Sequence, residues 1–199
     1  MIRAPRLPEP ADFDADVRQP GATWLAANPT AKRPRALWAP YTPVLEAGYG
    51  GLCGYAAMAD FTGGTVDHYR SFTKHRALAY EWSNYRFASA TMNSKKRAED
   101  DRVLDPEEVR AGWFEILLPS LQMRTTDRVP ARLRSKAAHT LHRLGLADGE
   151  RVIRWRRSWF ELYQRGDLSI EGLRTVAPLI AEAVERDGNP GGRRGDLQP

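Results

Sequence analysis

The stretch TVDHYRSFTKHRALAYEWSNYRFASATMNSKK, residues 65–96, decides how this chain is expected to fold. It opens with Thr65–Tyr69, a short run that predicts a strand. It continues through Arg70–Ala79, which is polar and basic and therefore reads as a loop. It closes with Ser89–Lys96, which we expect to be a helix. The stretch thus predicts a strand, a loop and a helix in that order.

Upstream residues are expected to complete a hairpin with this strand. A short strand is predicted near Cys53–Met58, and Gly63-Gly64 supplies the turn before Thr65–Tyr69. Asp67 and His68 then lie on or just beyond a strand. Neighbouring side chains leave opposite faces of a regular strand, so a site shared by Asp67 and His68 requires the strand to twist or to end at His68.

The whole chain is expected to form one α+β domain with extensions, because 199 residues with 42% hydrophobic content can bury a substantial core. Prolines and scattered charges give residues 1–29 no apolar period, so this part is expected to be a partly flexible N-terminal arm. Residues 30–110 form the predicted core, with helical stretches between Thr30 and Ala47. Residues 111–186 form a strand and a helical extension, and residues 187–199 a disordered tail.

The extension is expected to contain the strand Trp113–Leu118 and three helices. The first helix is predicted over Ala131–Arg143, ending before Gly145. The other two are predicted over Gly149–Gln164 behind an Asp148 cap and over Ile170–Glu185 behind a Ser169 cap.

The stretch also brings together side chains suited to phosphate chemistry. Asp67 and Asn93 offer the hard oxygen ligands that Mg²⁺ prefers, and His68 has an ordinary pKa of about 6.5 that lets a neutral ring take a proton from water. Taken singly, an Asp-His pair is common, and asparagines such as Asn84 and Asn93 usually serve as turn or helix-surface residues. The spacing of all of them within one stretch favours a shared site.

In these residues the chain resembles the HNH endonucleases, whose ββα-metal finger (His-Me finger) carries an Asp-His pair on a strand, an Asn in the following loop, and a His or Asn on the helix. It is also similar to a cysteine-poor branch of that family in four further places. These are Cys53-Gly54-Tyr55, Tyr80-Glu81-Trp82-Ser83-Asn84-Tyr85-Arg86, Val103-Leu104-Asp105-Pro106 and Gly112-Trp113-Phe114.

The resemblance implies a metal-dependent enzyme that nicks or cleaves DNA. By that likeness His68 is the general base, and Asp67 and Asn93 hold one divalent metal, with Mg²⁺ expected and Mn²⁺ or Ni²⁺ left open. Asn84 takes a supporting role and holds the loop or orients the His68 ring. The chain departs from the family in Tyr69-Arg70-Ser71-Phe72, where relatives have an aromatic, a variable residue, Pro and Lys, and at Arg97, where a Gly is common.

Many such fingers are braced by a structural zinc held by two Cys-x-x-Cys pairs. The matching places here are Cys53–Ala56 and Ser89–Met92, which keep the spacing but only one thiol. We therefore predict no structural zinc and expect packing to brace the finger instead, with Tyr55, Met92 and Trp82 as candidates.

A net charge of +5 and a pI near 9.5 favour polyanionic partners. DNA is the expected partner, and nothing in the sequence resembles a base-reading module. A separate ATPase or targeting subunit and a homodimer are left open, as is the biological system, phage defence, phage or mobile element. With one cysteine and no signal or membrane segment, we expect cytoplasmic residence without membrane attachment. The candidate DNA-binding residues around the motif are Arg70, Lys74, Arg86, Lys95, Lys96 and Arg97.

Two other functions compete with this prediction. The first is a non-catalytic subunit that keeps the finger as a scaffold for binding nucleic acid or a partner. The second is an enzyme that uses the finger for a reaction on a small molecule. Asp67, His68 and Asn93 argue against the scaffold, and the basic surroundings argue against the small-molecule enzyme.

Overall fold

The structure is a computed structural model that describes residues 1–60 and 62–188. It combines helices with two antiparallel sheets of two strands each, so the predicted α+β class is confirmed. The tail predicted over residues 187–199 falls, from residue 189 onward, outside the described residues. None of the helices within the described part combines the length and apolar character needed to cross a bilayer.

The centre of the molecule is a two-stranded ribbon followed at once by a helix. Strand β1 (Gly64–His68) pairs antiparallel with β2 (Tyr85–Ser89), which sets Asp67 opposite Arg86. Helix α3 (Ala90–Lys96) begins directly after β2, where the Ser89 hydroxyl accepts a hydrogen bond from the Met92 amide at 3.2 Å. Strand β2 therefore links the strand that carries Asp67 and His68, with which it pairs, to the helix that carries Asn93, which follows it.

The predicted strand at Cys53–Met58 is wrong, because the partner of β1 is β2. Residues 53–58 form buried turns, and one isolated bridge joins Leu52 to Ala59. Ala57 has a φ of 55°, a left-handed conformation outside regular strand geometry. The Gly54 amide donates to the Phe87 carbonyl at 2.9 Å, so these turns pack on β2 instead of pairing with β1.

The N-terminal residues belong to the core, which corrects the expected flexible arm over residues 1–29. A π-helical turn, Asp14–Arg18, leads into α1 (Gln19–Ala27), and α2 (Thr42–Gly48) follows. Phe13 and Val17 are fully buried in a group of mostly aromatic side chains, here called the aromatic cluster. The buried members of the aromatic cluster are Ala4, Phe13, Val17, Tyr41, Leu45, Tyr49, Val66, Ala79, Tyr80, Trp82, Tyr85 and Phe87.

The C-terminal part follows most of its predicted elements. Strand β3 (Phe114–Leu117) pairs antiparallel with β4 (Gln122–Thr125). Helix α4 (Ala131–Leu144) stops at Gly145, whose φ of 65° ends the helix in the left-handed conformation that glycine adopts readily. Helix α5 (Glu150–Gln164) starts from Gly149 with no side-chain cap, so the predicted Asp148 cap is wrong.

The last predicted helix is two helices, α6 (Ile170–Val176) and α7 (Pro178–Arg186). Pro178 lacks an amide hydrogen and disfavours helical geometry in the residue before it, so Ala177 leaves the helix and α7 starts in a new direction. The Ser169 cap is confirmed, since its hydroxyl accepts from the Gly172 amide at 3.1 Å.

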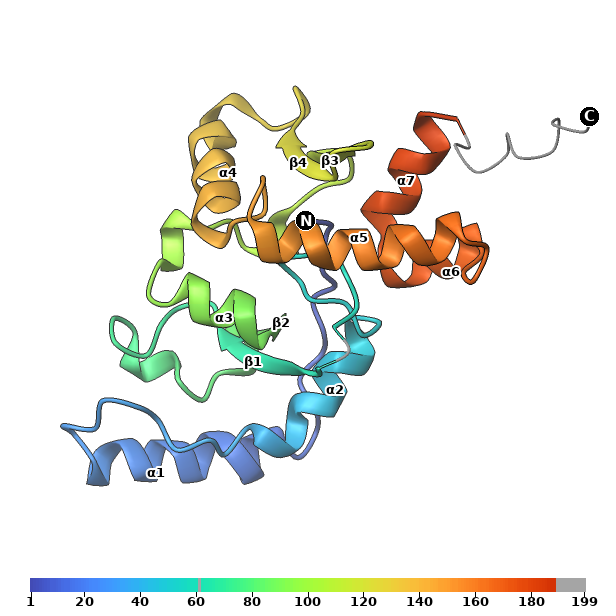
Figure 1. Ribbon diagram of the computed structural model, residues 1–199. Coiled ribbons are helices and arrows are strands. Elements are labelled where there is room, and N and C mark those ends of the chain that lie inside the picture. Colours follow the sequence, from blue (N-terminus) through green and yellow to red (C-terminus); the bar gives the residue numbers. More distant parts are fainter. Residues whose placement is uncertain (61, 189–199) are drawn as a thin grey trace, which may run out of the picture.

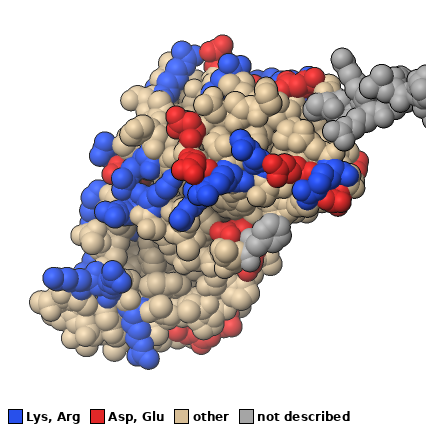
Figure 2. Space-filling view, in the orientation of Figure 1, with Lys and Arg blue, Asp and Glu red and all other residues tan. Residues whose placement is uncertain are grey.

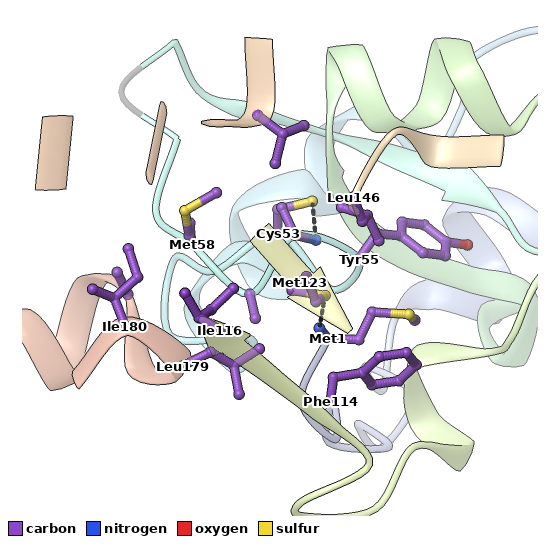
Figure 3. Close-up of a cluster of buried hydrophobic side chains, with 14 of the residues drawn as sticks. Met1, Cys53, Tyr55, Met58, Phe114, Ile116, Met123, Leu146, Leu179 and Ile180 are labelled. Atoms are coloured by element: carbon purple, nitrogen blue, oxygen red, sulfur yellow. Dashed lines mark hydrogen bonds between the residues drawn. The ribbon is translucent and has the colours of Figure 1, made fainter. Parts of the chain in front are cut away.

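The ribbon and α3 lie between two layers (Figure 1). Helices α1 and α2 lie on one side, and α4 to α7 with the β3–β4 sheet lie on the other. The second layer encloses a C-terminal cluster formed by buried hydrophobic residues at Met1, between Cys53 and Met58, and between Ala88 and Val184. Figure 3 shows part of it, in which Cys53, Tyr55 and Met58 belong to one cluster with side chains from β3, β4 and α7. The ribbon thus separates the aromatic cluster from the C-terminal cluster.

Candidate active site

An open pocket of about 290 Å³ lies where β1 ends, beside α3 and the segment before α2. Three residues predicted to form a site, Asp67, His68 and Asn93, all line it, whereas Asn84 does not. The lining residues are Arg33, Pro34, Trp38, Val66, Asp67, His68, Ser71, Phe72, Asn93 and Arg97.

His68 is half-buried on the face of the ribbon that meets the aromatic cluster. Its Nε2 lies 2.8 Å from the Ala79 carbonyl oxygen, which can only accept, so Nε2 carries the proton and Nδ1 of the neutral ring is an acceptor. The Trp38 ring packs edge-on against the imidazole with centroids 4.5 Å apart, and Tyr85 packs likewise at 5.0 Å. Burial lowers the pKa of His68 below its ordinary value, which favours the neutral ring near pH 7.

Asp67 points to the other face and is almost fully buried, with 2% of its surface exposed. The Tyr55 hydroxyl donates to Oδ2 at 2.6 Å, and Lys96 Nζ donates to Oδ1 at 3.0 Å. Lys96 also donates to the His68 carbonyl oxygen at 2.9 Å and has no exposed surface. Burial, followed by the Asp67 charge, raises the pKa of Tyr55 well above its ordinary value, so Tyr55 stays a donor. The Asp67 carboxylate is therefore held in a buried ion pair.

Arg86 extends the buried charges on the same face as Asp67. Its Nε and Nη2 donate to the two Asp105 carboxylate oxygens at 2.7 and 2.6 Å, a bidentate pair. The Tyr69 ring lies beneath both the Arg86 guanidinium and the Lys96 ammonium, with its centroid 5.5 Å from Arg86 Cζ and 5.7 Å from Lys96 Nζ. Because Arg86 and Lys96 are buried in ion pairs, their predicted role as DNA-binding residues is corrected.

Asn93 projects from α3 towards β1. Its Nδ2 donates to the Val66 carbonyl oxygen at 3.2 Å, which leaves the amide Oδ1 as the atom without a bond to the described residues. Asn93 Oδ1 and the Asp67 carboxylate are hard oxygen donors, and the two residues line one pocket. Both carboxylate oxygens already accept a hydrogen bond, from Tyr55 and from Lys96, and each keeps a second lone pair. This donor set fits Mg²⁺, which keeps several waters and needs one or two protein ligands. Residues 1–60 and 62–188 contain no group of three or more His, Cys, Asp or Glu that could hold a metal.

The Asn84 side chain links two parts of the loop between β1 and β2. Its Oδ1 accepts from the Arg70 amide at 2.7 Å, and its Nδ2 donates to the Arg70 and Leu78 carbonyls at 3.0 Å each. The hydrogen bond to Leu78 fixes the chain next to Ala79, whose carbonyl oxygen accepts the hydrogen bond from His68 Nε2. Asn84 thus contacts the chain that holds His68 and makes no hydrogen bond to the imidazole.

The remaining candidate DNA-binding residues differ in how free they are. Arg70 pairs with Asp101, Lys74 donates to the Ala98 carbonyl, and Lys95 donates to the Leu144 carbonyl at 3.0 Å. Arg97 and Arg33 are exposed and line the pocket. Neither arginine pairs with an acid in the described part of the chain. Figure 2 shows basic side chains gathered on the side of the molecule that carries α3 and the loops around β1.

The places where relatives of the resembled family carry zinc ligands meet in the core. Cys53, Ala56, Ser89 and Met92 are all buried, and the Cys53 sulfur accepts from the Ala56 amide at 3.5 Å. Burial raises the pKa of the Cys53 thiol, partly offset by hydrogen bonds from residues that include Ser89. Tyr55 and Met92 pack in the C-terminal cluster around this point, while Trp82 packs in the aromatic cluster on the other side of the ribbon.

Several functional neighbours were missed from the sequence. Trp38 precedes Asp67 by 29 residues and Arg33 precedes it by 34, and only the fold brings them to the pocket. The Ala79 carbonyl gives no side-chain signal. Asp105 could have been found, because it stands in the Leu-Asp-Pro motif that was noted without a partner.

No protein-family model and no curated protein matches the chain. The resemblance to the HNH endonucleases therefore rests on the residues and their arrangement alone.

Proposed function

We propose that the chain is a metal-dependent HNH-type endonuclease that hydrolyses DNA phosphodiester bonds at this pocket, with β1, β2 and α3 as its ββα-metal finger. The observation that carries the proposal is the shared pocket. It brings together His68, Asp67 and Asn93 with Arg33 and Arg97. Within residues 1–60 and 62–188, His68 Nδ1 has no hydrogen-bond partner, and neither arginine pairs with an acid.

His68 acts as the general base. Its Nδ1 accepts a proton from a water as the water oxygen attacks phosphorus. The P–O bond to one sugar oxygen then breaks, and that leaving oxygen takes a proton from solvent. The lowered pKa of His68 keeps the ring neutral for this role near pH 7. The hydrogen bond to Ala79 fixes the tautomer, and the Trp38 and Tyr85 rings fix the plane. The imidazole of His68 is therefore held in place before the reaction by groups that keep their positions during it.

The phosphate would be bound by Arg33 and Arg97, because unpaired guanidinium groups are suited to phosphate oxygens. Asp67 and Asn93 would hold the divalent metal, which when bound stabilises the charge that develops on the phosphoryl oxygens. Tyr55 and Lys96 orient the Asp67 carboxylate, and Lys96 also reduces its negative charge. We therefore expect a weak metal site that depends on millimolar concentrations of the ion.

The same ion pair favours a second candidate, a subunit that binds nucleic acid without cleaving it. A carboxylate already neutralised by Lys96 has less need of a metal, and the finger could serve as a scaffold. This candidate keeps the basic pocket rim but needs no base at His68. An enzyme that acts on a small molecule stays a prediction. A protein that shows no affinity for DNA would favour it. A separate targeting subunit fits either DNA-binding candidate.

Cleavage of supercoiled plasmid tests the proposal. Wild type is compared with His68→Ala in Mg²⁺ or Mn²⁺ and in EDTA, and His142→Ala, an exposed position on α4, serves as the matched control. We expect metal-dependent nicking that falls by about 10²- to 10⁴-fold in His68→Ala and persists in His142→Ala. DNA binding with no cleavage under any condition would support the scaffold instead, and equal cleavage by both variants would remove His68 from the mechanism.

A further inference from the structure

The pocket has aromatic and apolar walls that a site for backbone phosphates alone would not need. Trp38, Phe72 and Pro34 line it together with Arg33 and Arg97. Trp38 and Phe72 are both half-buried, so each ring is held by the protein and also reaches the pocket. A site that reads only phosphates uses cations and hydrogen-bond donors. The two rings call for a ligand with a planar face.

Phe72 is held rigidly. The Arg76 guanidinium lies over the ring at 4.8 Å from its centroid, and Arg76 Nη1 donates to the Ala31 carbonyl at 2.9 Å. The neighbouring Ser71 is fixed as well, since the buried Asp100 carboxylate accepts from its amide at 2.8 Å and its hydroxyl at 3.0 Å. A ring covered by arginine on one side can stack a ligand only on its other side, and the Phe72 ring is already ordered for such a contact.

The surroundings are unsuited to a groove of duplex DNA. A major groove is read by a helix or a two-stranded ribbon that enters it. Helix α3 spans only Ala90–Lys96 and buries Met92 and Lys96, and every residue of β2 is buried. The volume of about 290 Å³ is at the lower limit for small-molecule pockets, which suits one planar group.

We infer that the pocket takes an unpaired nucleobase next to the scissile phosphate, stacked on Phe72 and Trp38, and that the substrate is single-stranded or locally unpaired DNA. The inference rests on the proposed function, because it places the phosphate at Arg33 and Arg97 beside His68. Stacking on aromatic side chains is available to every base, so the preference is for strandedness and not for sequence. Negative supercoiling, which favours unpaired segments, should then make a plasmid a better substrate than its relaxed form.

Binding to the His68→Ala protein tests this inference without cleavage. Fluorescence anisotropy is measured with a labelled single strand, its perfect duplex, and the same duplex with a central mismatched bubble. Two variants in that background separate stacking from packing, because Phe72→Leu keeps an apolar side chain without the ring and Phe72→Tyr keeps the ring. We expect the single strand and the bubble to bind more tightly than the perfect duplex, and Phe72→Leu to weaken their binding by about 5- to 140-fold while Phe72→Tyr restores it.

The inference is overturned if the perfect duplex binds as tightly as the single strand, or if Phe72→Leu weakens both forms equally. The comparison of the three DNA forms needs no Phe72 variant, so a folding defect would not leave the question open. Failure of the inference is also distinct from failure of the proposed hydrolysis. If the protein cuts plasmid but binds duplex and single strand equally well, the proposed hydrolysis stands and the inference about unpaired bases fails. If it prefers single strands but does not cut, the inference stands and the hydrolysis fails.

Discussion

The two faces of the β1–β2 ribbon are built from different chemistry. On the face towards α3, Asp67 and Arg86 are sealed in ion pairs with Lys96 and Asp105. On the opposite face, His68 sits among aromatic rings with one nitrogen committed and the other free. Two neighbours in sequence thus have separate environments, and only the end of the strand lets both reach one pocket. An Asp-His pair is therefore not a single functional unit, because each side chain is tuned by the layer that it meets.

The largest expected effect comes from breaking the sealed face. Lys96→Met leaves the buried Asp67 carboxylate without its cation, which typically costs about 3–5 kcal/mol of unfolding free energy. Urea unfolding followed by circular dichroism measures the loss. Adding Asp67→Asn to this variant removes the orphaned charge and should recover much of the stability. A loss within the error of the measurement in the single variant would mean that the pair does not stabilise the ribbon.

The face that carries His68 is held by hydrogen bonds between neutral groups, so single substitutions there should cost less stability than loss of the buried ion pair. Asn84→Ala removes three hydrogen bonds to the loop, and we expect a loss of about 1–3 kcal/mol together with reduced cleavage, because the Ala79 carbonyl is no longer fixed. Asn84→Asp keeps the acceptor for the Arg70 amide but sets a buried carboxylate oxygen against the Arg70 and Leu78 carbonyls, so it should lose at least as much stability as Asn84→Ala. Unfolding curves and plasmid cleavage on the same preparations check both, and full activity in Asn84→Ala would exclude the loop from positioning His68.

The face that carries His68 should respond to pH through the imidazole. His68 has a folded pKa below its unfolded value, so the folded state binds fewer protons than the unfolded state in that interval. Its contribution to stability is complete above about pH 6.5 and is lost as the pH falls through the folded pKa. The acid limb of the cleavage profile should therefore have its midpoint below about pH 6.5. A midpoint above that value would contradict a base whose pKa is lowered by burial.

The smallest expected effect concerns the rim of the pocket. Arg97→Gln should weaken DNA binding and reduce the slope of log K against log salt by about 1, because one phosphate contact is lost. Stability should be unchanged, since Arg97 forms no ion pair with the described residues. Arg165→Gln removes the same charge from the exposed turn after α5, where Arg165 pairs with Asp167, and serves as the charge control. An equal change in both variants would show a general charge effect instead of a contact at the pocket.

The sequence predicted β1, α3, β3, α4 and α5 because their patterns are local. It missed β2 because the alternation in Tyr85–Ser89 covers only three residues and breaks at Ala88, since both faces of that strand are buried. Residues 53–58 are apolar as well, but they are buried in turns. The N-terminal residues were misjudged because their order comes from distant partners, as when Trp82 Nε1 donates to the Leu7 carbonyl at 3.1 Å.

The candidate site divides in the same way. The grouping of Asp67, His68 and Asn93 could be predicted, since all three lie within one stretch that the fold closes on itself. The burial of Arg86 and Lys96 could not, because a sequence shows a charge but not the partner that removes it from the surface. Trp38 and Phe72 carried no signal as pocket walls, since apolar residues in a sequence are read first as core.

The Ala79 carbonyl accepts from both His68 Nε2 and the Tyr85 hydroxyl, each at 2.8 Å. A carbonyl oxygen has two lone pairs, so these two donors occupy both and leave none for a water molecule. The acceptor that decides which imidazole nitrogen is reactive therefore belongs to the main chain, at a position whose side chain is a fully buried methyl group. Evolution could preserve this atom through any small residue that keeps the loop path, and a comparison of sequences would record only a tolerance for small side chains there.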